Sequence, residues 1–219
     1  RVLREEYMQF QANMAWYRDY MGDPTNEDWY DRIFGGAGDK WPCDFSTTTH
    51  LAGPGGFRKL NRSANDVRLI YFIRNPYERL WSHAKWHAMV LGQLDAFEAM
   101  TSAERVKFIK RYRLHRHSLA AGRIQAMRRA VGSGKVLVLN YDEIKADPET
   151  LLTLTTDFLG IAPVPLVEDL SYRHAASPPM AVDRVALETF AGAFEKDIGR
   201  LTAMGYDKAR GWHKSLPSA

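Results

Sequence analysis

Two short apolar runs constrain most tightly how this chain can fold. Residues 67–73 read VRLIYFI and residues 135–141 read KVLVLNY, and both are rich in β-branched and aromatic side chains. A run that is apolar at nearly every position is typical of a strand covered on both faces in a parallel sheet. The two runs therefore predict a mostly parallel sheet whose faces are covered by helices.

A helix-start signal follows each run. Asn75-Pro76 comes directly after the first run and Asp147-Pro148 comes shortly after the second, so each pair offers a capping side chain and a proline for the first helical turn. Strand and helix alternate along the chain, which favours a layered α/β fold. A length of 219 residues suits one domain, and we expect it to span residues 1–219.

The rest of the chain is predicted to be mainly helical, with a loop at Gly53-Pro54-Gly55-Gly56. Thr101 and Glu104 have the spacing of a capping box, and Asp183 is expected to cap one long helix that Gly205 ends. Other helices are expected over residues 5–20, 25–34, 57–62 and 118–131.

Positive charge is concentrated in one segment. The chain carries 30 Lys or Arg against 26 Asp or Glu, yet residues 105–129 hold nine basic side chains and no acidic one. Such a segment can be a solvated helix face, or it can attract an anionic ligand or polymer. No nucleic-acid-binding motif accompanies it, so nucleic acid is not an expected partner.

Three features exclude other classes of protein. Cys43 is the only cysteine, so no internal disulfide or cysteine metal cage can form, and a reducing, cytoplasmic location is expected. The longest apolar run, residues 69–73, is far shorter than a membrane span. His83 and His87 have a zinc-like spacing, but no third ligand or intervening Glu accompanies them, so no metal is expected.

The segment after the first run has the outline of a phosphate site. The run delivers Arg74 at the carboxyl end of a strand, where ligands bind in open α/β sheets, and a helix start next to it favours an anion. Ser82 follows two turns into that helix and offers a hydroxyl, while Arg74 offers a forked donor. Arg74 could equally pair with a carboxylate of the core.

The segment RNPYERLWS at residues 74–82 resembles the R-[DN]-P-x-x-R-x-x-S motif of sulfotransferases. In that family the first Arg and the Ser hold the 3′-phosphate of the sulfate donor, 3′-phosphoadenosine 5′-phosphosulfate. The likeness spans residues 28–212. Further segments are similar to bacterial and carbohydrate-type members of the family: Trp29-Tyr30 with Phe34, residues 44–47 (DFST), residues 135–144, Asp147-Pro148 and Gly211-Trp212.

The resemblance implies a three-layer α/β sandwich with a mostly parallel sheet, related to the P-loop NTPase fold. It also implies that Arg74 and Ser82 bind the donor, with Arg123, which follows a Gly at the expected place, as a further donor contact. Members of the family open with a strand and a K-x-G-T-[ST] loop that holds the 5′-phosphosulfate. No such segment occurs in residues 1–219, and we expect it upstream of Arg1.

The implied chemistry is transfer of a sulfuryl group to a hydroxyl or amine of a glycan, lipid or small-molecule acceptor. Asp44 occupies the acidic position of the family's loop and is the candidate general base, although an Asp there can also cap a turn. His50 is the second candidate because its ordinary pKa lies near neutrality. The alternative function is a catalytically inactive module that binds a nucleotide or a polyanion.

Overall fold

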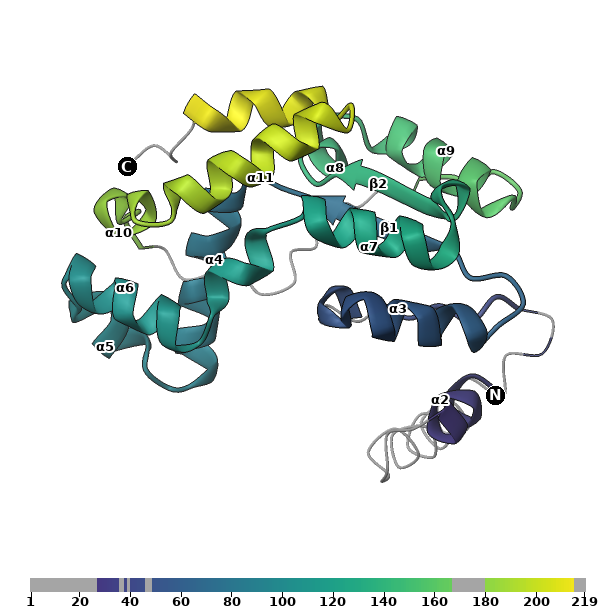
Figure 1. Ribbon diagram of the computed structural model, residues 1–219, viewed down its shortest axis with the longest axis horizontal. Helices are drawn as coiled ribbons and strands as arrows, with labels where there is room; N and C mark the ends of the chain where they lie inside the picture. The colour runs from purple at the N-terminus through teal and green to yellow at the C-terminus, as the bar shows by residue number, and fades with distance from the viewer. Residues whose placement is uncertain (1–26, 36–37, 39, 46–48, 167–179, 215–219) are drawn as a thin grey trace, which may run out of the picture.

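The computed structural model describes residues 27–35, 38, 40–45, 49–166 and 180–214, and shows a helix-rich α/β chain with a small parallel sheet (Figure 1). The helix predicted over residues 5–20 lies outside the described residues. The helices, 3₁₀-helices (η) and strands are α2 (Glu27–Phe34), η2 (Thr49–Leu51), α3 (Gly53–Arg62), β1 (Leu69–Ile73), α4 (Pro76–Val90), α5 (Leu94–Ala99), α6 (Ser102–Arg111), η3 (Leu114–Ser118), α7 (Ala121–Val131), η4 (Ser133–Lys135), β2 (Val136–Asn140), α8 (Glu143–Ala146), α9 (Pro148–Leu159), α10 (Arg184–Glu188), α11 (Ala191–Ala203) and η5 (Asp207–Lys214).

The two apolar runs form the two strands of a parallel pair, as predicted. β1 and β2 lie in register from Leu69 opposite Val136 to Ile73 opposite Asn140. The amide of Tyr141 donates to the Ile73 carbonyl at 2.8 Å, which extends the ladder one residue past β2. The connection between the strands runs through α4, α5, α6 and α7, so both strands end at the same edge of the sheet (Figure 1).

The faces of β1 differ, and this corrects the expectation that the strand is covered on both. Tyr71 packs against the apolar cores, and Ile73 is buried. The side chains of Ile70 and Phe72, which alternate with these, are 36% and 39% exposed. The alternation arises because successive side chains of a strand point to opposite faces. One face of β1 is therefore open among the described residues, and the three-layer sandwich remains a prediction.

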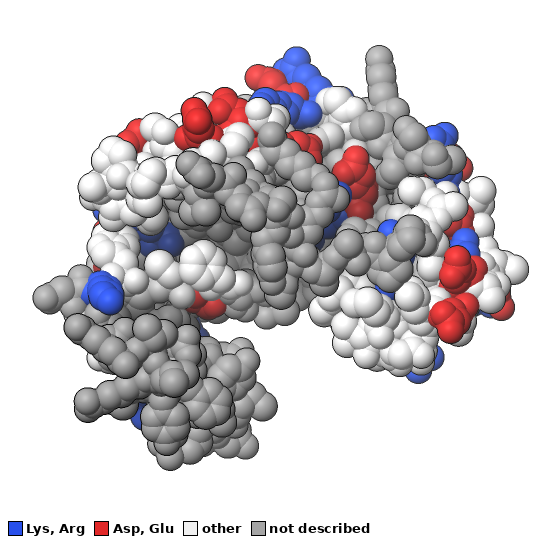
Figure 2. Space-filling model, turned by 180° about the vertical axis from the view of Figure 1, so that it is seen from behind, with Lys and Arg blue, Asp and Glu red and all other residues white. Residues whose placement is uncertain are grey.

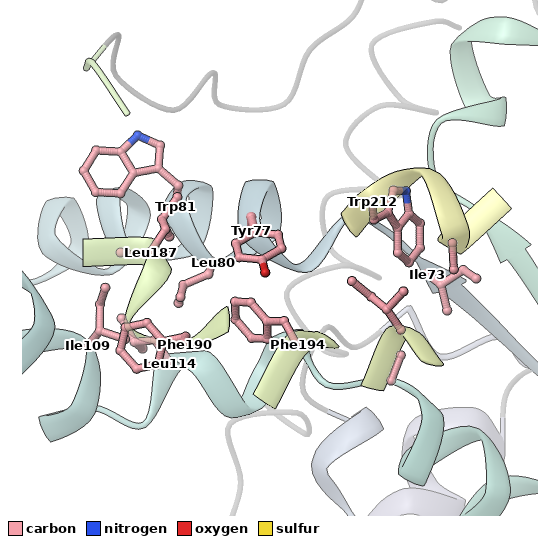
Figure 3. Packing of buried hydrophobic residues seen from close by; sticks show 14 of the residues in the cluster. Ile73, Tyr77, Leu80, Trp81, Ile109, Leu114, Leu187, Phe190, Phe194 and Trp212 are labelled. Atoms are coloured by element: carbon pink, nitrogen blue, oxygen red, sulfur yellow. The ribbon is translucent and has the colours of Figure 1, made fainter. Parts of the chain in front are cut away.

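The larger core lies between α4, α6 and the two C-terminal helices (Figure 3). Tyr77 of α4 meets Phe194 of α11 edge to face, with ring centroids 5.0 Å apart. Trp81, one turn further along α4, packs against Phe97 with centroids 5.8 Å apart. Burying such aromatic rings contributes much of the stability of a core, so α4 is anchored along its length.

A smaller core joins α3 and α7 to the same face of the sheet, next to the larger core. Its buried members are Phe57, Met127, Val131 and Val136. Both cores contact Tyr71, so β1 lies at the boundary between them. The two cores therefore lie side by side on one face of the sheet.

Capping predictions are confirmed at α4, α6 and α9. The Asn75 side chain accepts from the Tyr77 amide at 3.0 Å, and Thr101 and Glu104 form the capping box at α6. Asp147 accepts from the Thr150 amide at 3.1 Å, and Gly160 ends α9 in the left-handed conformation.

Two boundaries differ from those predicted. The expected loop at residues 53–56 is the first turn of α3, because Pro54 suits a first turn and Gly56 lets that turn close. A Cβ at Gly56 would lie 2.6 Å from the Cβ of Ala52. The long helix expected after Asp183 is divided into α10 and α11 by a turn that buries Phe190, whose ring stacks on His115 at 5.1 Å.

A search of the described residues finds no helix that combines the length and the apolar character needed to cross a bilayer.

Candidate functional site

The carboxyl edge of the sheet brings together two side chains that follow the strands. Arg74 comes after β1, Tyr141 comes after β2, and the guanidinium carbon of Arg74 lies 4.9 Å from the centroid of the Tyr141 ring. This distance is within the range of a cation–π contact. Arg74 was expected here from the sequence; Tyr141 was not singled out, although it is the last residue of the second predicted strand.

Arg74 is only partly used by its protein neighbours. Its Nη2 donates to Oε2 of Glu78 at 3.2 Å, in an ion pair one helical turn apart. Its Nε is buried and has no hydrogen-bond partner among the described residues. A buried donor without an acceptor is costly, so the Nε edge of this guanidinium is suited to an external acceptor such as a phosphate oxygen.

Helix α4 begins beside Arg74 and carries the second predicted donor contact. The first turn is fixed by Asn75, whose side chain is buried on the Tyr77 amide. Ser82 is half-buried and lies four residues after Glu78, hence on the same face of the helix. Arg74 reaches this face through its contact with Glu78, so the structure places Arg74 and Ser82 along one side of α4.

Arg79 and Arg123 have a different environment from Arg74, since both donate to the backbone carbonyls of η3 and the residue after it. Arg79 Nη1 bonds to the His117 carbonyl, and Arg123 bonds to the carbonyls of Arg116, His117 and Leu119. Burial lowers the pKa of both guanidinium groups, and the positive charge of Arg79 lowers the pKa of Arg123 further. The predicted donor contact of Arg123 would require this guanidinium to serve the carbonyls and a ligand together.

The two candidate bases lie in one short segment but have opposite exposure. Asp44 is exposed and accepts a hydrogen bond from the Thr49 hydroxyl at 3.4 Å. His50 follows Thr49 in the chain, lies in η2 and is only 8% exposed. Its ring faces Tyr71, with centroids 6.2 Å apart, and His117, at 5.6 Å. The carboxylate is therefore open to an acceptor, whereas the imidazole is turned inward.

Four imidazoles form a continuous row, which we call the imidazole row: His50, His117, His83 and His87. The ring centroids are 5.6 Å apart from His50 to His117, 4.7 Å from His117 to His83 and 6.2 Å from His83 to His87. Burial lowers the pKa of His83 to about 4, and the nearby His117 and Arg79 add to the effect. The sequence offered only the helical spacing of His83 and His87; the other members come from distant segments.

Part of the basic segment 105–129 is engaged within the protein, whereas its other basic side chains are exposed: Lys107, Lys110, Arg111, Arg113, Arg116 and Arg129. Arg105 pairs with Asp183 at 2.8 Å, and Arg128 donates to the Tyr206 hydroxyl at 2.7 Å. On the face seen in Figure 2, the Lys and Arg atoms of the described residues stand in small groups among acidic ones and form no continuous patch. Among the described side chains, no group of three or more His, Cys, Asp or Glu could hold a metal ion.

Comparison with known proteins identifies a fold. The chain resembles the crystal structure of a sulfotransferase from Alicyclobacillus acidocaldarius, with a TM-score of 0.60, 21% sequence identity, and coverage of 87% of this chain and 75% of that chain. No protein-family model matches the chain, and no curated protein matches it by sequence. The chain therefore has a sulfotransferase-like fold.

Proposed function

We propose that the protein is an enzyme that transfers a sulfuryl group from 3′-phosphoadenosine 5′-phosphosulfate to a hydroxyl or amine of a glycan, lipid or small-molecule acceptor. The observation that carries this proposal is Arg74, whose partly unsatisfied guanidinium lies at the carboxyl edge of a sheet in a sulfotransferase-like fold. No metal takes part in the proposed reaction.

In the proposed reaction the acceptor oxygen or nitrogen attacks the donor sulfur in line. The bond from sulfur to the bridging oxygen breaks, adenosine 3′,5′-bisphosphate leaves, and the acceptor's proton passes to a base. The protein holds both substrates in line and stabilises charge, while the covalent changes occur between the substrates themselves.

Arg74 and Ser82 are proposed to hold the 3′-phosphate of the donor. The Nε edge of Arg74 would complete a charge-assisted hydrogen bond, and the Ser82 hydroxyl would donate from the same side of α4. Tyr141 would stabilise the Arg74 guanidinium through a cation–π contact with its ring. Arg123 is proposed as a secondary donor contact, since it lies on the helix after η3.

Asp44 is proposed as the general base because its carboxylate is exposed, whereas His50 is buried. We expect Asp44→Asn to lower turnover by about a hundredfold while nucleotide affinity stays nearly unchanged, because the base acts on the acceptor rather than on the donor. The measurement is steady-state sulfation by a form of the protein that carries the predicted donor loop. Turnover that survives in this variant but is lost in His50→Gln would transfer the role to His50.

Isothermal titration with adenosine 3′,5′-bisphosphate tests the function. We expect Arg74→Ala to weaken binding by about 1.5 to 3 kcal/mol, the scale of one hydrogen bond to a charged group. Lys107→Ala is the matched control, because Lys107 is an exposed cation of the basic segment. Its binding constant should stay within about twofold of the unmodified protein.

The same titration separates the alternative function, a binding module for polyanions. Such a module would lose affinity steeply as salt is added and would respond to Lys107→Ala as much as to Arg74→Ala. Arg105 and Arg123 of the basic segment already donate to Asp183 and to the Leu119 carbonyl, which argues against a polyanion-binding role for these two side chains. Equal responses of the two variants would contradict the proposed donor site.

A further inference from the structure

We propose that the imidazole row is an acid-sensitive joint, which holds η2 against α4 and η3 at neutral pH and releases η2 when the pH falls. The row crosses between separate elements: His50 belongs to η2, His117 to η3, and His83 and His87 to α4. Each neighbouring pair of ring centroids lies within 6.2 Å, so the imidazoles are among the contacts that bridge these elements.

The surroundings of the row are strongly positive. Arg79 of α4 lies near both His83 and His117, and Arg123 of α7 lies near His117. His115 of η3 adds a further imidazole beside His117. Tyr71 of β1 faces His50 and is neutral at the pH values considered, because burial raises the pKa of its hydroxyl.

A carboxylate near this group is already engaged. Asp197 of α11 interacts with Tyr71 and Arg123, and it accepts hydrogen bonds from the amides of Ala120 and Ala121 at 2.7 and 3.2 Å. Its carboxylate is therefore engaged by the amides at the start of α7. A proton added to the row would meet arginines rather than a free counter-charge.

The direction of the pH effect follows from this environment. Burial, with the neighbouring cations, lowers the pKa of His83, His117 and His87, so the closed joint holds protons less tightly than an open one. When the closed state has the lower pKa, opening is coupled to proton uptake. For each proton taken up, the ratio of open to closed protein then rises by about tenfold for each pH unit of acidification. Acidification below the ordinary imidazole pKa of about 6.5 therefore shifts the equilibrium progressively toward the open joint.

η2 is the element that we expect to separate, because it is much shorter than α4. It is three residues long, its turn is closed by the Ala52 amide on the Thr49 carbonyl at 3.0 Å, and Thr49 also bonds to the exposed Asp44. By contrast, α4 is fixed in the core by Tyr77 and Trp81. Repulsion inside the row would therefore move η2 and leave α4 in place.

The joint links acidity to the proposed base. Opening would displace His50 and the neighbouring Thr49–Asp44 contact, so acid would disable the site that removes the acceptor's proton. This consequence depends on the proposed function, but the opening itself does not.

Hydrogen exchange measured by NMR tests the opening without any assay of activity. After correction for intrinsic rates, we expect protection of the Ala52 amide to fall by about tenfold or more between pH 7 and pH 5, whereas the Met204 amide at the end of α11 keeps its protection. In the double variant His83→Gln and His117→Gln, the fall at Ala52 should shrink to less than about threefold.

His115→Gln is the control for a change within η3, since His115 is not a member of the row and its ring stacks on Phe190. It should retain the full acid response at Ala52. A second probe, the pH titration of the His50 imidazole signals, covers the case in which the double variant does not fold. Protection at Ala52 that is constant between pH 7 and 5, or that falls equally at Met204, overturns the proposal. If the joint responds but Arg74→Ala leaves nucleotide binding unchanged, only the proposed function fails.

Discussion

Two arginine-bearing regions of the molecule have opposite relations to their surroundings. In the basic segment 105–129, Arg105 and Arg123 direct their donors to carbonyls and a carboxylate of the protein itself. At the edge of the sheet, Arg74 has an ion pair with Glu78 and leaves its buried Nε without a partner among the described residues. Arg105 and Arg123 are therefore structural, whereas the single arginine after β1 is suited to binding.

This difference shows that the density of charge in a sequence is a poor guide to a binding site. A guanidinium carries five donors, and a folded chain offers many carbonyls that can accept from them. What marks Arg74 is the combination of an unsatisfied donor with a position at the carboxyl edge of the sheet; Arg128 also has an Nε that is unsatisfied among the described residues but lies in α7. Arg74 meets this criterion and Arg123, with three carbonyl partners, meets it less well.

The largest expected effect comes from Arg105→Ala, which should lower the free energy of unfolding by about 3 kcal/mol in urea denaturation. The variant leaves Asp183 buried without its cationic partner. Burial acts to raise the pKa of Asp183, yet its bonds to the Ala186 amide, Arg105 and Ser102 hold that pKa below its usual range. Arg129→Ala, at an exposed position, is the control and should change stability by less than about 0.5 kcal/mol.

Arg123→Ala should have a smaller effect, about 2 kcal/mol of stability, because it removes the donor from the carbonyls of Arg116, His117 and Leu119. This variant also sharpens the comparison between the regions. A loss of nucleotide affinity as large as that of Arg74→Ala would place Arg123 in the donor site. An effect on the urea midpoint alone would assign it to the structural group.

The smallest effects are expected from a matched pair of helix caps. One is at α4, beside Arg74, and the other is at α6, the helix that carries Arg105. Asn75→Ala at α4 and Thr101→Ala at α6 should each cost about 1 kcal/mol, since each removes a side chain that accepts from a first-turn amide. Only Asn75→Ala should also lower nucleotide affinity, because Asn75 fixes the start of the helix beside Arg74. Titration and urea denaturation of both variants measure the two effects, and an equal loss of affinity in both would contradict the distinction.

Local signals in the sequence were sufficient for the elements that carry the candidate site. The positions of the two strands, the caps at Asn75, Thr101 and Asp147, and the place of Arg74 after β1 follow from patterns within a few residues. The exposed face of β1 did not follow, because a uniformly apolar run is compatible with a strand covered on one face or on both. The break between α10 and α11 did not follow either, since it depends on where Phe190 finds its partner.

The sequence by itself determined which residues can form strands and capped helices, because those preferences are set by neighbours in the chain. Only the tertiary structure decided which cations are satisfied: the carbonyls that bind Arg123 are up to seven residues away, and the partner of Arg105 is 78 residues away. The imidazole row likewise brings His50 and His117, which are far apart in the sequence, to a ring distance of 5.6 Å. Such contacts depend on how helices pack in space, and no pattern along the chain encodes that packing directly.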